Sequence, residues 1–408
     1  MTKNLSKLWL KSLRRIGRVQ QTQGRMLLKS MLPTAVRSVT VLRPKPVKRA
    51  RSVGVKGAKG LAGLNGVKAR VKAVRRPRAM TLPLAPALPG AWQKSWFSTS
   101  IKGPAGGAKR MLYWLYLPAK ETLAPRPLVV MLHGCQQTAP EFAAATRMNT
   151  LAERKGFAVL YPQQSVASDA HRCWHWYKRA TQQGQGDVEL IADMIAQVRQ
   201  KHGLDASRTY VAGLSAGAAL ASIVALRHPG LIAAVGLHSA PVYGTTDSAM
   251  SAYRAMQHGS PLAHRHTVRA LAQAEPEFPG MPVMLIHGAR DSVVRRINME
   301  QLSEQFEILN AAAITSAEPV VRRYPGRAGG RSPRHACQTS TIYAGRKPLI
   351  VKCEVEALGH AWSGGDGSVQ FSAPEGPDAA LMMWTFFSHH RRTPDVVATR
   401  LTASLPRL

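Results

Sequence analysis

The chain has 408 residues, 45% of them hydrophobic, which is typical of a folded protein and excludes general disorder. Its formal net charge is +34, but residues 1–120 contain 27 lysines and arginines and no acidic residue, whereas the rest of the chain carries only about +7. This asymmetry predicts a basic tail joined to an ordinary domain, and the lack of any apolar run of about 18 residues excludes a membrane-spanning helix.

The N-terminal part of the chain predicts two basic segments. In residues 1–32, apolar residues recur at steps of three and four between lysines and arginines, which indicates a basic amphipathic helix rather than a standard secretory signal. Such a helix either lies on an anionic surface or packs on the domain. Residues 33–90 are rich in Lys, Arg, Pro, Gly and Ala and predict a disordered linker. We expect residues 1–90 to attract an anionic membrane, a polymer granule or nucleic acid without sequence preference.

Residues 91–392 predict one α/β catalytic domain, followed by a C-terminal tail at 393–408. Apolar strand patterns alternate with helical patterns, which is typical of a mostly parallel, doubly wound sheet. The polar, helix-leaning segment 245–280 is interpreted as a cap-like insertion that gates substrate size. The expected strands are 110–117, 127–132, 157–161, 209–212, 232–237, 282–286 and 349–355, and the expected helices are 140–155, 187–202, 216–228, 298–312 and 377–389.

A serine between two glycines follows the fourth of these strands and precedes a helix. Gly213, Ser215 and Gly217 have the G-x-S-x-G spacing of a nucleophile elbow. The turn is so tight that a side chain at either glycine would strike its neighbours. The motif occurs by chance in many proteins, so its strand–turn–helix context carries the prediction that Ser215 is a nucleophile.

A nucleophilic serine needs a base, and the base needs an acid that orients it. Asp291 follows the expected strand 282–286, and His360 follows the expected strand 349–355, so all three residues fall at strand ends in the order serine, acid, histidine. The alternatives are an ion pair of Asp291 with Arg290 or Arg295, and a loop histidine at 360.

The oxyanion of a tetrahedral intermediate needs fixed hydrogen-bond donors. The backbone N–H of Ala216 is one candidate, and that of Cys135 is the other, with Gln136 as the fallback. His133 lies in the same loop, where we expect it to shape the loop rather than to act as a base.

Four cysteines occur, and none has the spacing of a zinc ligand, so we expect no structural metal and no cofactor. They allow two disulfides in any of three pairings, or four reduced thiols.

Several segments resemble the family of poly(3-hydroxybutyrate) depolymerase-like esterases, a branch of the α/β-hydrolases that includes feruloyl and acetylxylan esterases. The resemblance covers about residues 95–390 and rests on LHGCQQTA at 132–139, LAERKGFAVLYPQQ at 151–164, CWHWY at 173–177, GDVELI at 186–191, GLSAG at 213–217 and GHAWSGG at 359–365. It departs from the family at Ala218, where relatives usually continue with glycine.

The resemblance implies an α/β-hydrolase fold and a carboxylic-ester hydrolase that forms an acyl-enzyme on 3-hydroxyalkanoate oligomers or polymer. It also implies disulfides Cys135–Cys173 and Cys337–Cys353. The indoles of Trp174, Trp176 and Trp362 are expected either to line the substrate pocket or to be ordinary core aromatics. Family membership favours an extracellular location, whereas the lack of an apolar signal favours a cytoplasmic or granule-associated one.

Two other functions stay open from the sequence. One is a feruloyl or acetyl carbohydrate esterase with the same triad and a different pocket. The other is a non-enzymatic basic protein that binds a surface or nucleic acid and uses the hydrolase domain as a scaffold.

Overall fold

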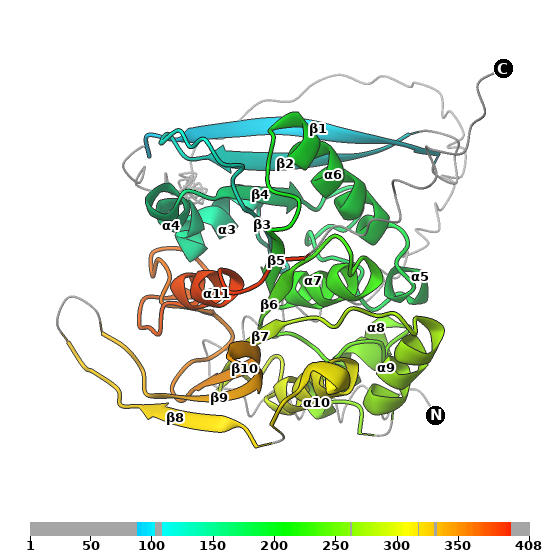
Figure 1. The fold of residues 1–408 in the computed structure, drawn as a ribbon, viewed down its shortest axis with the longest axis vertical. Coiled ribbons are helices and arrows are strands. Elements are labelled where there is room, and N and C mark those ends of the chain that lie inside the picture. The colour runs from blue at the N-terminus through cyan, green and yellow to red at the C-terminus, as the bar shows by residue number, and fades with distance from the viewer. Residues whose placement is uncertain (1–87, 103–107, 262, 317, 330–332, 393–408) are drawn as a thin grey trace, which may run out of the picture. The chain divides into compact units, whose positions relative to one another are not determined.

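A computed structural model describes residues 88–102, 108–261, 263–316, 318–329 and 333–392 (Figure 1). The helix expected at 1–32, most of the linker expected at 33–90 and the tail expected at 393–408 lie outside these residues. Those expectations therefore stay predictions.

A sheet of ten strands forms the centre of the described residues, in the order β1-β2-β4-β3-β5-β6-β7-β10-β9-β8. Its six inner strands are parallel; β3 to β7 are buried on both faces of the sheet, whereas β10 is partly exposed. These strands are β3 (Leu128–Leu132), β4 (Ala158–Gln163), β5 (Thr209–Leu214), β6 (Ala234–His238), β7 (Val283–Gly288) and β10 (Lys347–Val355).

Antiparallel strands extend the sheet on both sides. The hairpin of β1 (Ala91–Lys102) and β2 (Ala108–Leu117) adds to β4, and β9 (Cys337–Ala344) and β8 (Val320–Tyr324) add to β10. The short strands β11 (Trp362–Ser363) and β12 (Ser372–Ala373) pair separately, in the segment that follows β10.

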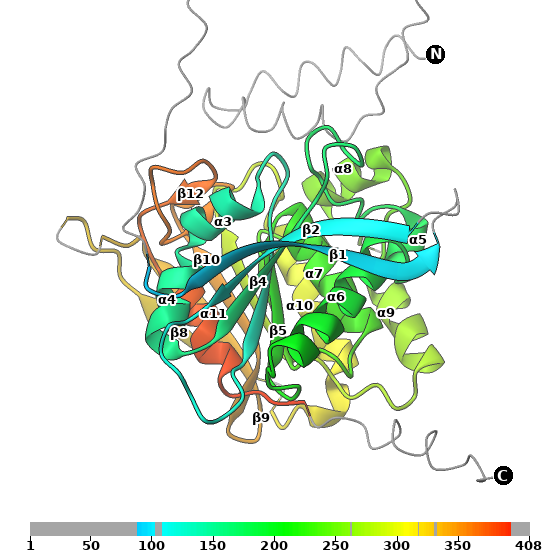
Figure 2. The same ribbon diagram turned by 90° about the horizontal axis from the view of Figure 1, so that it is seen from above.

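Helices cover both faces of the sheet because successive side chains of a strand point to opposite faces. In β3, Val130 packs in the cluster that includes α6 and α7, whereas Val129 packs in the cluster of α3, α4 and α11. Figures 1 and 2 show these two layers on opposite sides of the strands. One layer contains α3 (Ala139–Thr146), α4 (Met148–Lys155) and α11 (Ala379–Phe387); the other contains α6 (Asp187–Lys201), α7 (Ala216–Arg227), α8 (Ala249–His258), α9 (Ala263–Ala274) and α10 (Ile297–Leu309). The shortest helices are α5 (Arg179–Gln182) and the 3-10 turn η1 (Ala311–Ala313).

This arrangement confirms the predicted α/β class and the doubly wound sheet. The helix expected at 140–155 is instead two helices, because Arg147 adopts a left-handed conformation with φ of 53° and ends α3 before α4 begins. The segment expected as a cap, 245–280, contains α8 and α9 between β6 and β7. Among the described residues, no helix is both long and apolar enough to cross a bilayer.

Candidate active site

Ser215 stands on a sharp turn between β5 and α7. Its backbone has φ of 57° and ψ of −120°, a conformation that side-chain-bearing residues rarely adopt and that is typical of nucleophile elbows. The expected need for glycines on either side is confirmed. A Cβ on Gly213 would lie 2.5 Å from the carbonyl carbon of Gly217, and one on Gly217 would lie 2.1 Å from the carbonyl oxygen of Leu132.

Asp291 and His360 are brought together from two loops 69 residues apart. His360 Nδ1 lies 2.7 Å from Asp291 Oδ2, and Asp291 Oδ1 accepts the backbone N–H groups of Val293 and Val294 at 2.9 Å each. Burial alone would raise the pKa of Asp291, but the charge and hydrogen bond of His360 outweigh it and hold that pKa below its ordinary value. The carboxylate therefore stays ionised and fixes His360 with Nδ1 as the donor.

The other ring nitrogen of His360, Nε2, is buried and has no hydrogen-bond partner among the described residues. No hydrogen bond joins it to Ser215 here; such bonds are often long in unliganded enzymes and shorten when substrate binds. With Nδ1 donating to Asp291, Nε2 carries the free lone pair that a general base needs.

His238, the last residue of β6, links Ser215 to the loop of His360. Its carbonyl oxygen accepts the N–H of Ser215 at 2.9 Å, and its ring Nε2 accepts the N–H of Ser363 at 3.2 Å. The ring also stacks on Trp362 with centroids 5.1 Å apart. Burial lowers the pKa of His238 to about 3, so the ring stays neutral and keeps accepting. No sequence pattern singles out this residue, whose only signal is a histidine at a strand end.

The predicted oxyanion loop, residues 133–137, lies beside Ser215. A Cβ on Gly134 would lie 3.8 Å from Ser215 Cβ, so this loop and the start of α7 face the same space. The N–H of Gln136, the fallback donor, already donates to His171 O at 2.6 Å. Cys135 N–H and Ala216 N–H have no acceptor among the described residues, so both can donate to a ligand.

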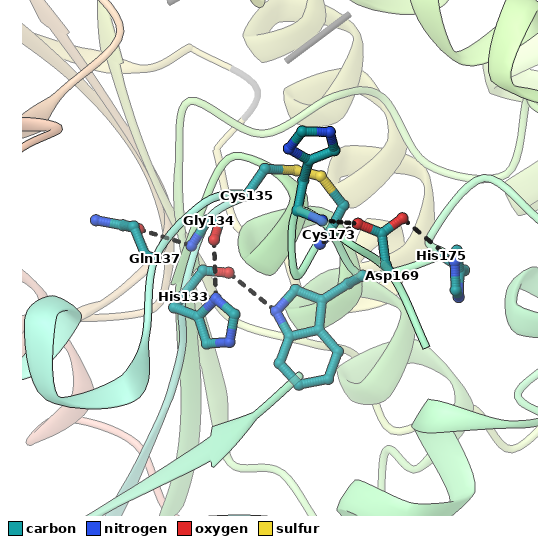
Figure 3. The surroundings of a disulfide bond; sticks show 9 residues. His133, Gly134, Cys135, Gln137, Asp169, Cys173 and His175 are labelled. Carbon is teal, nitrogen blue, oxygen red and sulfur yellow. Dashed lines mark hydrogen bonds and ion pairs between the residues drawn. A yellow bond between two sulfur atoms is a disulfide. The ribbon is translucent and has the colours of Figure 1, made fainter. Parts of the chain in front are cut away.

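A disulfide and several hydrogen bonds hold this loop in place (Figure 3). Cys135 is bonded to Cys173, as the resemblance implied. The indole N–H of Trp174 donates to His133 O at 2.9 Å, and Gly134 N–H donates to Gln137 Oε1 at 2.8 Å. The carboxylate of Asp169 in turn accepts the N–H of Cys173 at 3.0 Å.

His133 shapes the loop, as expected. Its buried Nε2 accepts the N–H of Gln164 at 3.1 Å, and its Nδ1 lies 2.8 Å from Gly134 O. Burial lowers the pKa of His133 to about 4, which keeps the ring neutral and able to accept.

The second disulfide implied by the resemblance, Cys337–Cys353, is wrong in this structure, because both cysteines are buried free thiols. They lie on the neighbouring strands β9 and β10, but Cys353 is opposite Thr339 and Cys337 is opposite Val355. Diagonal neighbours lie farther apart than directly opposite residues, which disfavours a bond between their sulfurs. The hydrogen bond between the two thiols lowers the pKa of Cys337 and raises that of Cys353.

The three tryptophans expected at the substrate are all buried. Trp174 is bonded to the oxyanion loop, and Trp362 stacks on His238 and meets Phe142 edge-on at 5.7 Å. The indole N–H of Trp176 has no hydrogen-bond partner among the described residues. These contacts brace the site loops, and contact of the rings with a substrate stays a prediction.

No group of three or more metal-ligating side chains that could hold an ion occurs in the described part of the chain.

Residues 111–324, just over half of the chain, match the family model described as esterase PHB depolymerase. The chain belongs to this family. Poly(3-hydroxyalkanoate) depolymerase C of Paucimonas lemoignei is 32% identical over 187 residues, which cover 45% of this chain and 45% of that protein. Feruloyl esterase B of Neurospora crassa is 29% identical over 214 residues, which cover 48% of this chain and 69% of that protein.

One solved structure has a similar fold over most of the chain. The acetyl xylan esterase from Aspergillus awamori superposes with a TM-score of 0.53 at 20% identity, over 72% of this chain and 99% of that chain. This likeness shows the α/β-hydrolase fold alone. The sequence match to the depolymerases of Paucimonas lemoignei and Ralstonia pickettii covers less than half of each of those proteins, 45% and 36% respectively.

Proposed function

We propose that this chain is a serine esterase that hydrolyses carboxylic esters through an acyl-enzyme. The observation that carries the proposal is the 2.7 Å contact between Asp291 and His360, whose loop is linked through His238 to the strained turn of Ser215. A buried aspartate that orients a histidine with a free Nε2 is the arrangement that activates a serine hydroxyl.

In the proposed reaction, Ser215 Oγ attacks the ester carbonyl while His360 Nε2 takes its proton. The N–H groups of Cys135 and Ala216 stabilise the oxyanion, and the alcohol leaves with a proton from His360. Water, deprotonated by His360, then attacks the acyl-serine and releases the acid. Asp291 orients His360 in both steps and stabilises its protonated form.

For the substrate, we propose 3-hydroxyalkanoate oligomers or polymer. This proposal is supported by the family and by the depolymerase relatives from Paucimonas lemoignei and Ralstonia pickettii. The second candidate, a feruloyl or acetyl ester of a carbohydrate, is favoured by coverage: this chain spans 69% of feruloyl esterase B but less than half of either depolymerase.

Ser215→Ala tests the mechanism, with Ser222→Ala on the same helix as its control. We expect Ser215→Ala to lower kcat for p-nitrophenyl butyrate by about 10⁴ or more, because the nucleophile is lost. Ser222 bonds only to Ala219 O within α7, so its variant should keep the wild-type rate. A folded wild-type protein without turnover that depends on Ser215 would favour the scaffold function instead.

A substrate panel separates the two esterase functions. Release of acid from hydroxybutyrate oligomers is compared with release from feruloyl and acetyl sugars, at equal concentrations of the ester bond. A higher kcat/KM on the oligomers supports the depolymerase proposal, and a higher value on the sugars supports the carbohydrate esterase.

We also propose that the protein acts outside the cytoplasm. The Cys135–Cys173 disulfide supports this location because disulfides persist in oxidising compartments and are rare in reducing ones.

A further inference from the structure

A cavity of about 890 Å³ lies away from Ser215, Asp291 and His360, and none of the three lines it. Its described walls come from α4 and the turn before it, from Arg327, Pro333 and Arg334 between β8 and β9, and from the loop that follows His360. Figures 1 and 2 both show α4, α11 and β8 on the same side of the molecule. Its volume is in the range of small-molecule sites.

Four arginines from separate parts of the chain line this cavity, which we call the arginine cleft: Arg147, Arg154, Arg327 and Arg334. The carboxylate in its lining is that of Asp378, and this group already accepts the N–H of Leu381 as the cap of α11. The described lining residues therefore include four arginines and one aspartate, and the argument for anion binding depends on Arg147, Arg154 and Arg334.

Two of these guanidinium groups donate to backbone carbonyl oxygens. Arg147 donates to the carbonyl oxygen of Gly364, and Arg334 Nε donates to that of Pro325 at 3.1 Å. A carbonyl oxygen fixes a guanidinium in place without cancelling its charge, so both groups keep donors for an anion. All four arginine side chains are exposed, so water screens the repulsion between them and a dissolved anion can reach them.

We propose that the arginine cleft is a second binding site, which takes a small polyvalent anion that carries carboxylate or phosphate groups. Guanidinium groups bind both kinds of oxyanion through paired hydrogen bonds, which explains why arginine rather than lysine lines the cleft. Gly364 and Gly365 also line it, four and five residues after His360, so an occupant contacts the loop that carries His360.

Thermal unfolding of the full chain with citrate or inorganic pyrophosphate tests this site, and the two probes distinguish a carboxylate from a phosphate ligand. The double variant Arg154→Ser/Arg334→Ser is compared with Arg254→Ser/Arg269→Ser, which removes the same charge from exposed positions on α8 and α9. Ionic strength is kept constant at about 0.15 M, because screening alone changes the binding of any anion. Residues 1–87 are the same in all proteins, so anions bound there affect each of them equally.

We expect at least one probe to raise the Tm of the wild type and of the control with the same half-saturating concentration. In Arg154→Ser/Arg334→Ser that concentration should rise by about tenfold or more, because two charged hydrogen-bonding groups are lost. The proposal would be overturned if the half-saturating concentration rose equally in the two double variants, or if neither probe raised the Tm of the wild type.

One further measurement checks that the variants are folded, and a second variant serves if the first does not fold. All variants should hydrolyse p-nitrophenyl butyrate at the wild-type rate without the anion, which verifies folding. If the double variant unfolds, the single change Arg154→Lys replaces it: this exposed residue keeps its charge but loses the paired donors, and binding should weaken there too.

Discussion

The environment of Asp291 determines what its side chain does in the proposed reaction. The carboxylate is buried, and its two oxygens bond His360 on one side and two backbone N–H groups on the other. An asparagine there keeps the size of the side chain but offers an N–H₂ group in place of one oxygen. If that group faces His360, the ring takes the other tautomer and Nε2 carries the proton.

We therefore expect Asp291→Asn to lower kcat for p-nitrophenyl butyrate by about 10⁴, with little change in secondary structure by circular dichroism. Asp366→Asn is the control, because this aspartate accepts hydrogen bonds from Ser368 in the same loop region as His360 but lies outside the proposed triad. A wild-type rate in Asp291→Asn would remove Asp291 from the mechanism.

Among the candidate site residues, those that belong to a short sequence motif or directly follow an apolar strand could be predicted from the sequence. The glycines around Ser215 are dictated by contacts within one turn, so their spacing is visible in the chain. Asp291 and His360 follow apolar strands, which placed them at one edge of a parallel sheet. His238 could not be found this way, because its ring accepts an N–H from Ser363, 125 residues later, and only the completed fold brings the two together.

The oxyanion loop shows how an element without regular structure is fixed. Gln136 has φ of 65°, and the loop is tied by the Cys135–Cys173 bond to the segment between β4 and α6. Without that bond, only hydrogen bonds would resist movement of the N–H of Cys135 away from Ser215.

Replacing Cys135 and Cys173 with serine should lower the free energy of unfolding by about 2–4 kcal/mol, measured in urea. The kcat for p-nitrophenyl butyrate should fall as well, because the oxyanion donor is less firmly placed. Cys337→Ser, at a free thiol, is the control, and a reductant should affect the wild type but not the double variant. If kcat is unchanged in the double variant, the disulfide has no part in positioning the loop.

Among the elements, the six inner strands were predicted because each contains a short run of apolar residues, which Lys352 and Glu354 interrupt only in β10. The strands β1, β8 and β9 were missed because they lie toward the sheet edges, where exposed polar residues interrupt the pattern. All five residues of β8 are exposed. The boundary between α3 and α4 at Arg147 was missed too, because the positive φ of an arginine does not change the hydrophobic periodicity of residues 140–155.

Across the whole molecule, buried neutral histidines connect stability to pH. Burial lowers the pKa of His133 to about 4, of His238 to about 3 and of His390 to about 4, from an ordinary value of 6.5. In the unfolded chain these histidines therefore bind protons as the pH falls below about 6.5. In the folded protein the same histidines bind protons only at a lower pH. Stability is full above the unfolded pKa and falls as the pH drops toward the folded values.

We expect the free energy of unfolding to decrease between about pH 6.5 and pH 4, with each histidine contributing on the order of 3 kcal/mol at most. In His238→Gln, the amide oxygen can still accept the N–H of Ser363 but cannot titrate, so the decrease should be shallower. Urea unfolding at a series of pH values measures both slopes. A His238→Gln slope equal to that of the wild type would contradict this account.

The open edges of the sheet have a consequence for how copies of the protein meet. β1 and β8 end the sheet as far as the described residues form it, and no described strand pairs with the outer edge of either. Arg322 and Arg323 on β8 and Lys94 on β1 are exposed, and charges on an edge strand repel a second strand that would add to it. Changing Arg322 and Arg323 to valine would leave five consecutive apolar or aromatic side chains on β8. Size-exclusion chromatography should then show self-association and aggregation at concentrations where the wild-type protein remains dispersed.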